Sequence, residues 1–192
     1  RSALGADMSR LLDADLATQW VAPLADALRA RGWRLATAGR CTGGLIAATC
    51  TSLAGSSDWY ECGFVTYSNT AKAEQLGVDP TLIAQHGAVS RQTAEAMATG
   101  GLERSAANHC LSITGIAGPD GGTPDKPVGT VAVALAADGY GEDGAQSKIY
   151  QLWGNREWVK VLTSQVALDW VRRALLGLNP LESGFGQKKG KR

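Results

Sequence analysis

Extended and helical segments alternate along the middle of this chain, and that order constrains the fold more than any other feature of the sequence. Trp33–Ala38 alternates in polarity as a strand does, and a glycine turn then leads into an apolar helical segment that begins at Leu45. Gly63–Tyr67 and Cys110–Thr114 are two further strand-like segments, separated by helical ones. Parallel strands need such crossovers, because the chain must return to the same end of the sheet before the next strand begins. The order therefore predicts an α/β fold.

The flanking segments complete the expected layers. Apolar residues recur at helical spacing from about Ser9 to Arg31 and again over Glu157–Leu176. Val128–Ala136 and Ser147–Trp153 are typical of an antiparallel hairpin. Good N-cap residues begin three shorter helices, at Asn69, Asp79 and Ser90. The sequence thus predicts a three-layer α/β/α sandwich with a mixed, mostly parallel sheet.

Length and charge limit the classes of protein that this chain can belong to. A chain of 192 residues suits one hydrophobic core, and a formal net charge of +1 offers no electrostatic basis for binding nucleic acid or an acidic membrane. No segment has the roughly 18 apolar residues of a membrane span, and the N-terminus shows no signal-peptide pattern. We expect a cytoplasmic protein with one domain over residues 8–177 and a disordered basic tail over 178–192.

Cysteine and histidine spacing gives no sign of a metal site. The 4 cysteines and 2 histidines match no zinc pattern, so we expect reduced thiols, no metal and no cofactor. His86 is expected to support the turn that follows it. The terminal helices carry apolar stripes with tryptophans that could pair between subunits, which favours a homo-oligomer; these residues are Trp20, Trp158 and Trp170.

Ligands of open α/β sheets gather at the carboxyl ends of the strands, and the segments expected there are unusual. Glycines in Gly39–Gly44 could bring backbone N–H groups close to an anion, or could serve tight packing. Lys72 would lie in a first helical turn, where the macrodipole lowers the pKa of an amine, unless it is simply exposed to solvent. Thr114–Pro119 leads into a proline- and glycine-rich loop that is either a lid or a connector. Arg156 could bind a phosphate or play a structural part.

Several blocks of the sequence, taken together, resemble one known family. Over Leu24–Arg172 the chain reads CTGGLIAA, AGSSDWYECGFVTYSNTAK, GVDPTL-x-x-x-HGAVS and TGIAGPDGGTPDKPVGTV, in an order and spacing similar to those of the CinA C-terminal domain family. The resemblance implies the same α/β/α fold. It also implies a small nucleotide ligand and the family's activity, the hydrolysis of nicotinamide mononucleotide to nicotinate mononucleotide and ammonia without a cofactor.

The resemblance also implies roles for individual residues. The family's alanine-glutamate-serine-cysteine-threonine-glycine-glycine signature matches Ala38–Gly44, which puts Gly39 at the glutamate and Arg40 at the nucleophilic serine. Tyr67 and Lys72 match the residues thought to activate that serine. Thr114 matches a further catalytic hydroxyl residue, and the implied substrate-binding residues are Thr42, Gly43, Gly44, Asn69, Gly115, Gly118 and Arg156.

Arg40 is a departure that bears directly on activity. An arginine stays protonated and cannot attack a carbonyl. Cys41 is a better nucleophile, but neighbours in an extended segment point to opposite faces, and Thr42 belongs to the glycine turn. Two hypotheses follow. The chain is an amidohydrolase in which one of these neighbours substitutes for the serine, or it is a binding or regulatory relative that holds a pyridine nucleotide in a more positive pocket.

Overall fold

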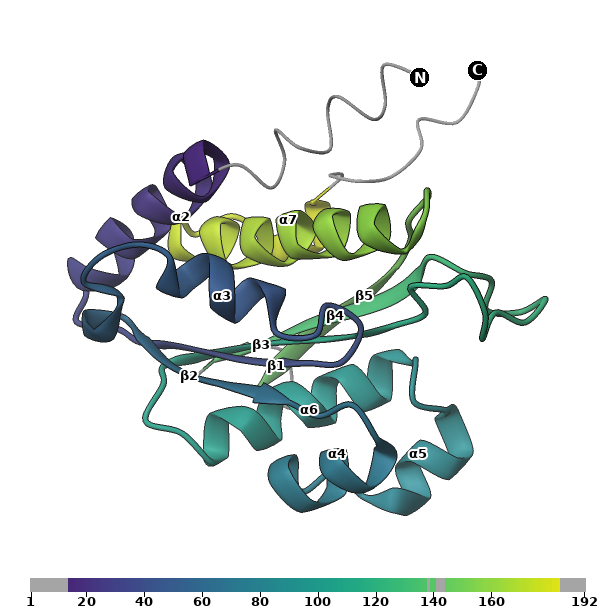
Figure 1. Cartoon of the computed structure of the whole chain (residues 1–192). Coiled ribbons are helices and arrows are strands. Elements are labelled where there is room, and N and C mark those ends of the chain that lie inside the picture. Colours follow the sequence, from purple (N-terminus) through teal and green to yellow (C-terminus); the bar gives the residue numbers. More distant parts are fainter. Residues whose placement is uncertain (1–13, 138, 141–143, 184–192) are drawn as a thin grey trace, which may run out of the picture.

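A five-stranded mixed sheet forms the centre of the structure, a computed structural model that describes residues 14–137, 139–140 and 144–183 (Figure 1). The strands lie in the order β2-β1-β3-β4-β5. β1 is parallel to β2 and β3, whereas β4 is antiparallel to β3 and β5, so four of the five strands run in one direction. The mixed, mostly parallel sheet is confirmed. The strands are β1 (Leu35–Gly39), β2 (Tyr60–Val65), β3 (His109–Gly115), β4 (Thr130–Ala137) and β5 (Ala145–Gln151).

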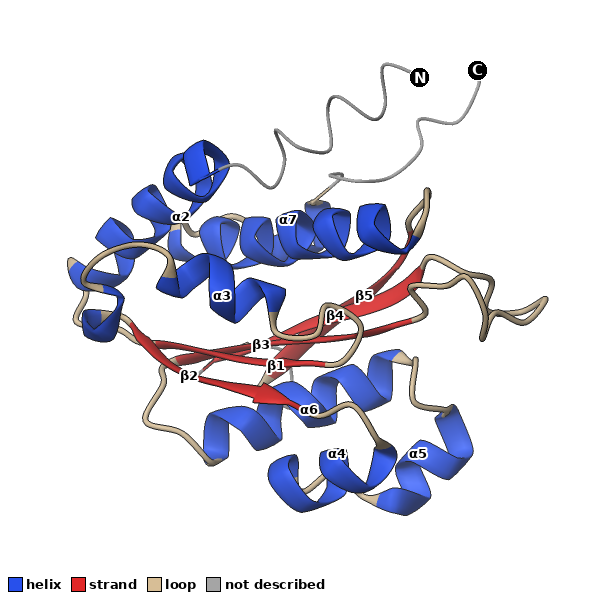
Figure 2. Ribbon diagram, viewed as in Figure 1, coloured by secondary structure: helices blue, strands red, loops and turns tan. Residues whose placement is uncertain are grey.

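Helices cover both faces of this sheet and complete the predicted three-layer sandwich (Figure 2). One face carries α2 (Ala14–Arg29), α3 (Leu45–Thr51) and α7 (Arg156–Leu175), and the other carries α4 (Asn69–Leu76), α5 (Pro80–His86) and α6 (Arg91–Glu103). A short 3-10 helix, η1 (Ser56–Asp58), precedes β2. The predicted helix start near Ser9 lies outside the described residues. None of the helices in the described ranges is both long and apolar enough to span a bilayer.

The two helical layers pack on the sheet in different ways. Large side chains such as Leu24, Leu111 and Trp170 fill the layer of α2, α3 and α7. Alanines of α6 meet alanines of β4 on the other face, which brings that helix close to the sheet. Gly100 of α6 lies so near α4 that an added Cβ would overlap the carbonyl oxygen of Leu76. Close packing of α6 thus fixes the position of α4 and of the loop before it.

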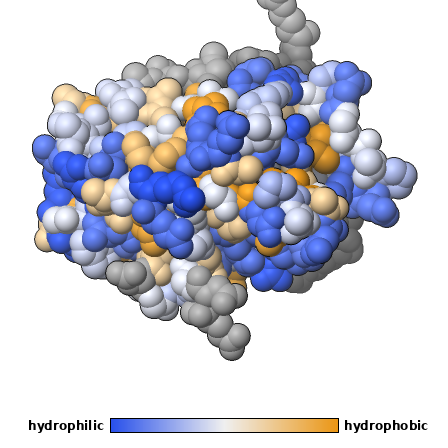
Figure 3. Space-filling model, turned by 90° about the horizontal axis from the view of Figure 1, so that it is seen from below, coloured by the Kyte–Doolittle hydropathy of each residue, from blue (hydrophilic) through white to orange (hydrophobic). Residues whose placement is uncertain are grey.

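Viewed from below, the surface mixes hydrophilic and hydrophobic residues (Figure 3). Trp170, expected as a core or interface residue, is fully buried and donates a hydrogen bond to the Tyr150 hydroxyl at 2.7 Å. This tryptophan therefore belongs to the core of the chain and offers no surface for pairing between subunits.

Local hydrogen bonds confirm two of the expected helix caps and correct the third. Asp79 and Ser90 cap α5 and α6 as predicted. The cap of α4, however, is Ser68, whose hydroxyl accepts a hydrogen bond from the Ala71 backbone N–H at 3.0 Å, whereas Asn69 is already the first helical residue. Serine has the same capping chemistry as asparagine, and the backbone of Ser68 is extended, as a cap requires.

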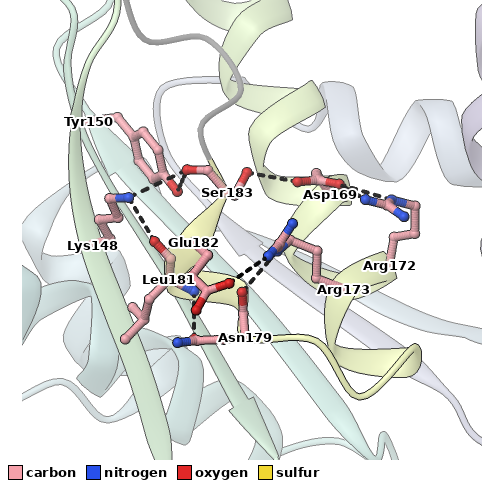
Figure 4. Close-up of polar contacts among 9 residues, drawn as sticks. All are labelled: Lys148, Tyr150, Asp169, Arg172, Arg173, Asn179, Leu181, Glu182 and Ser183. Atoms are coloured by element: carbon pink, nitrogen blue, oxygen red, sulfur yellow. Dashed lines mark hydrogen bonds and ion pairs between the residues drawn. The ribbon is translucent and has the colours of Figure 1, made fainter.

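The start of the expected disordered tail is folded, which corrects that prediction. Pro180–Glu182 form a 3-10 helix, η2, against α7 (Figure 4). Ser183 is buried; its hydroxyl donates to the Asp169 carboxylate at 2.7 Å, and its carbonyl accepts from the Tyr150 hydroxyl at 3.3 Å. One short turn has too few residues to show a hydrophobic period, so the sequence pattern did not reveal it. Residues 184–192 lie outside the described residues.

Candidate ligand-binding site

A cavity of about 310 Å³ lies at the carboxyl ends of β1 and β3, where the sequence places a ligand site. Arg40 and Cys41 follow β1, Gly115 ends β3, and residues 116–118 follow that strand on the wall of this cavity. Tyr67, beyond the end of β2, and Arg156, at the start of α7, complete the set of predicted residues that line it. The volume is at the lower end of the roughly 300–1,000 Å³ range of small-molecule sites.

A tight turn after β1 brings two consecutive residues, Arg40 and Cys41, to the cavity wall. The Arg40 N–H donates to the Ile113 carbonyl at 3.1 Å, and the Arg40 carbonyl accepts from the Gly43 N–H at 3.2 Å. Gly43 and Gly44 have positive φ angles of 62° and 88°, which glycine adopts without strain. Because the strand ends at Gly39, its side-chain alternation ends there too. The prediction that the Cys41 and Arg40 side chains point to opposite faces stays a prediction: both residues line the cavity, and the Cys41 side chain is buried in the core on the α2, α3 and α7 face.

Arg40 rests against Tyr67 at the cavity wall. The guanidinium carbon lies 5.6 Å from the centre of the Tyr67 ring, within the range of a cation–π contact. Arg40 is half-buried, and Tyr67 is exposed. The arginine thus stands in the cavity beside one of the residues that the resemblance assigns to catalysis.

Lys72 lies behind the cavity wall rather than on it. Its side chain is fully buried, and its amine donates hydrogen bonds to the backbone carbonyls of Thr66 at 3.0 Å and Ser68 at 3.3 Å. Burial lowers the pKa of Lys72 to about 8, and the positive charge of Arg40 adds to that lowering. The sequence attributed a lowered pKa to the helix dipole, but removal from water is the larger cause.

Other predicted site residues do not face the cavity. Thr114 is buried, and its hydroxyl donates to the Ala88 carbonyl at 2.7 Å, which ties β3 to the segment before α6. Asn69 lies in a groove between α4 and α5. Thr42 and Gly44 line a separate, narrow space beside Gly39. Five of the predicted residues therefore line the cavity: Arg40, Tyr67, Gly115, Gly118 and Arg156. The other six do not line it: Thr42, Gly43, Gly44, Asn69, Lys72 and Thr114.

The proline- and glycine-rich loop contributes charged residues that the sequence analysis did not single out. Lys126 and Asp120 both line the cavity. The Lys126 amine donates to the His86 carbonyl at 3.0 Å, and the Arg156 guanidinium donates to the Gly118 carbonyl at 2.8 Å. The sequence signal that could have identified Lys126 and Asp120 is the presence of charged residues in a loop that follows the end of a strand. With Arg40, the wall has three cationic residues and one carboxylate, which suits an anionic ligand.

Cys41 is held as a neutral thiol. Its side chain is buried, and burial raises the pKa to about 11, although the charges of Arg40, Arg156 and Lys72 partly oppose that change. A protonated thiol is a poor nucleophile. Within the described ranges, no three histidine, cysteine, aspartate or glutamate side chains form a group that could hold a metal ion.

Comparison with known sequences identifies close relatives. The family model described as the CinA C-terminal domain matches residues 17–175. A CinA-like protein of Geotalea uraniireducens is 47% identical over 159 residues, which are 83% of this chain and 37% of that protein. A CinA-like protein of Mycolicibacterium gilvum is 52% identical over 147 residues, covering 76% of this chain and 34% of that protein. The chain spans about a third of the length of these curated relatives.

Solved structures show the same arrangement of the chain. The competence/damage inducible protein CihA from Agrobacterium tumefaciens is 40% identical with a TM-score of 0.74, over 85% of this chain and 94% of that chain. A CinA superfamily protein from Klebsiella pneumoniae is 34% identical with a TM-score of 0.78, over 84% of this chain and 98% of that one. Since the family match covers most of the residues and the fold agrees, this chain belongs to the CinA C-terminal domain family.

Proposed function

We propose that this chain binds a pyridine mononucleotide in the cavity at Arg40 and that its hydrolysis of nicotinamide mononucleotide is lost or greatly weakened. The position of Arg40 carries the proposal. Its guanidinium lies over the Tyr67 ring and lines the cavity where the family resemblance expects a serine hydroxyl. A guanidinium remains charged and only donates hydrogen bonds, so it cannot attack a carboxamide carbon.

The charges of the cavity support the binding part of the proposal. Lys126 and Arg156 face the space from the loop and from the start of α7, and Asp120 adds a carboxylate. Lysine and arginine suit a phosphate through charge-assisted hydrogen bonds, and a carboxylate can accept hydrogen bonds from ribose hydroxyls. A mononucleotide supplies both groups.

Hydrolysis through Cys41 is the second candidate. Cys41 lines the same cavity as Arg40, so a substrate held there could come within reach of its thiol. Its pKa of about 11 leaves only about one thiol in ten thousand ionised near neutral pH, so a reaction through this residue would be slow without a further base.

Ammonia release and ligand-dependent melting distinguish these functions. We expect the purified chain, mixed with nicotinamide mononucleotide, to release little or no ammonia and to show a higher melting temperature. Ammonia release that disappears in Cys41→Ala would establish the second candidate instead. A chain that neither releases ammonia nor changes its melting temperature at millimolar ligand would overturn the proposal.

Restoring the hydroxyl tests whether the rest of the site still functions. We expect Arg40→Ser to release ammonia, and Arg40→Gln, which removes the charge without supplying a nucleophile, to release none. Adding Gly39→Glu is a harder change, because a Cβ at Gly39 would lie 3.1 Å from Cγ1 and 3.2 Å from Cδ1 of Ile113, which must then shift. An inactive Arg40→Ser would argue against the catalytic roles that the resemblance implies for Tyr67 and Lys72.

A further inference from the structure

The three cations of the cavity differ in how their hydrogen-bond donors are used. Arg156 donates to the Gly118 carbonyl, and Lys126 donates to the His86 carbonyl. Within the part of the chain that the structure describes, Arg40 makes hydrogen bonds through its backbone alone, and its guanidinium lies over the Tyr67 ring. Arg40 therefore presents a set of unused N–H donors to the cavity.

The location of these donors relates them to one part of the ligand. In a family whose nucleophile stands at this position, the carboxamide must come next to residue 40 for the reaction to occur. The substrate and the product of that reaction differ only in this group. A carboxamide offers a guanidinium one carbonyl oxygen, beside an NH₂ group that is itself a donor. A carboxylate offers two acceptor oxygens and a negative charge in the geometry that arginine binds bidentately.

We infer that Arg40 makes this cavity selective for the acid, nicotinate mononucleotide, over the amide, nicotinamide mononucleotide. The inference rests on the proposed function, since it concerns the ligand of the same cavity. The chain would then bind nicotinate mononucleotide, the product of the reaction that the resemblance implies. Arg40, which replaces the nucleophile, would also be the residue that recognises the carboxylate of this product.

The surroundings of Arg40 favour this selectivity. The acid carries one more negative charge than the amide, and the wall has three cationic residues against one carboxylate. The ring of Tyr67 holds the guanidinium at one side of the cavity, which reduces the freedom it would lose on binding. Because Arg40 is half-buried, we expect an effect at the low end for a charge-assisted pair, with the acid bound about tenfold more tightly.

Titration calorimetry with both ligands tests the inference. Dissociation constants of the two nucleotides are measured for the unaltered chain and for Arg40→Gln, which supplies no nucleophile at position 40. We expect a preference of about tenfold for the acid in the unaltered chain and none in Arg40→Gln. Arg104→Gln is the matched control for loss of one positive charge, because Arg104 ends the 13-residue helix α6 about 20 Å from its N-terminal end beside the cavity. We expect this control to keep the preference.

Other results of the titrations would overturn either the inference or the proposed function. Equal affinities in the unaltered chain, or a preference that survives in Arg40→Gln, would overturn the inference and leave the proposed function standing. A loss in Arg40→Gln that is the same for both ligands would show that Arg40 contacts a part that the two nucleotides share, such as the phosphate, which also overturns the inference. If the unaltered chain binds neither nucleotide, the proposed function itself fails. Circular dichroism of Arg40→Gln, and Arg40→Lys as a second variant, check that a lost preference is not lost folding.

Discussion

The buried amine of Lys72 allows a quantitative test of the site through stability. Its ammonium group has been removed from water, and its hydrogen-bond partners among the described residues are two backbone carbonyls, those of Thr66 and Ser68. Lys72→Met keeps an unbranched side chain of similar length and removes the charge. The difference in free energy of unfolding between the unaltered chain and this variant is compared across pH, and its change with pH isolates the ionisation of Lys72.

The expected pH dependence follows from the pKa of the amine. Folding lowers that pKa from 10.5 to about 8, which at about 1.4 kcal/mol per pH unit makes the charged form cost about 3 kcal/mol. Below pH 8 both the folded and the unfolded states are protonated, and the full cost is present. Between pH 8 and 10.5 the unfolded state binds more protons, so stability rises with pH. The unaltered chain should gain about 2 kcal/mol relative to Lys72→Met between about pH 7 and about pH 9.5.

Urea unfolding of the two proteins at several pH values measures this difference. Burial raises the pKa values of Cys41 to about 11 and of Cys50 to about 12, so both proteins lose stability above about pH 9. The Cys50 contribution cancels in the comparison, and the Cys41 contribution differs between the two proteins only through the coupling of its thiol to Lys72. Arg40→Gln provides an internal check, because removing this charge raises the pKa of Lys72 and moves the gain to higher pH. A difference that stays constant from pH 7 to 9.5 would refute the view that Lys72 is a desolvated cation.

Two further predictions concern packing and the C-terminal segment. Gly100→Ala should destabilise the fold by about 3 kcal/mol despite alanine's higher helix propensity, because the added Cβ overlaps the Leu76 carbonyl and forces α6 away from α4; an unchanged urea midpoint would contradict this. Asp169→Ala should cost about 2 kcal/mol, because it leaves the buried Ser183 hydroxyl without its acceptor. In that variant, a smaller loss on adding Ser183→Ala would show the coupling of the pair, and strict additivity would show its absence.

The sequence predicted those features that depend on local pattern. The order of strands and helices identified a three-layer α/β/α fold, and Asp79 and Ser90 cap the helices that they were expected to cap. Glycines after β1 and the segment after β3 indicated where the cavity lies. The arginine at position 40, where the family resemblance implies a serine, was visible from the motif alone. Each of these features depends on the types and spacing of residues within a few positions of one another, and the sequence shows both directly.

Tertiary structure decided which way the side chains of the site face. Arg40 and Cys41 both line the cavity because a turn follows the end of β1 at Gly39. The hydroxyl of Thr114 is taken by the Ala88 carbonyl, 26 residues away in sequence. Lys72 has a lowered pKa mainly because other elements exclude water from it.

Local and long-range interactions separate what the sequence determined in this protein from what the tertiary structure decided. Hydrophobic period, glycine turns and capping residues are local, so the sequence alone determined the layers and the end of the sheet at which the site lies. Desolvation, hydrogen-bond partners and shared cavity walls arise from residues far apart in the chain, and Ser183 against Asp169 is one example. Only the packed fold brings such groups together, because their interaction depends on distance in space rather than along the sequence.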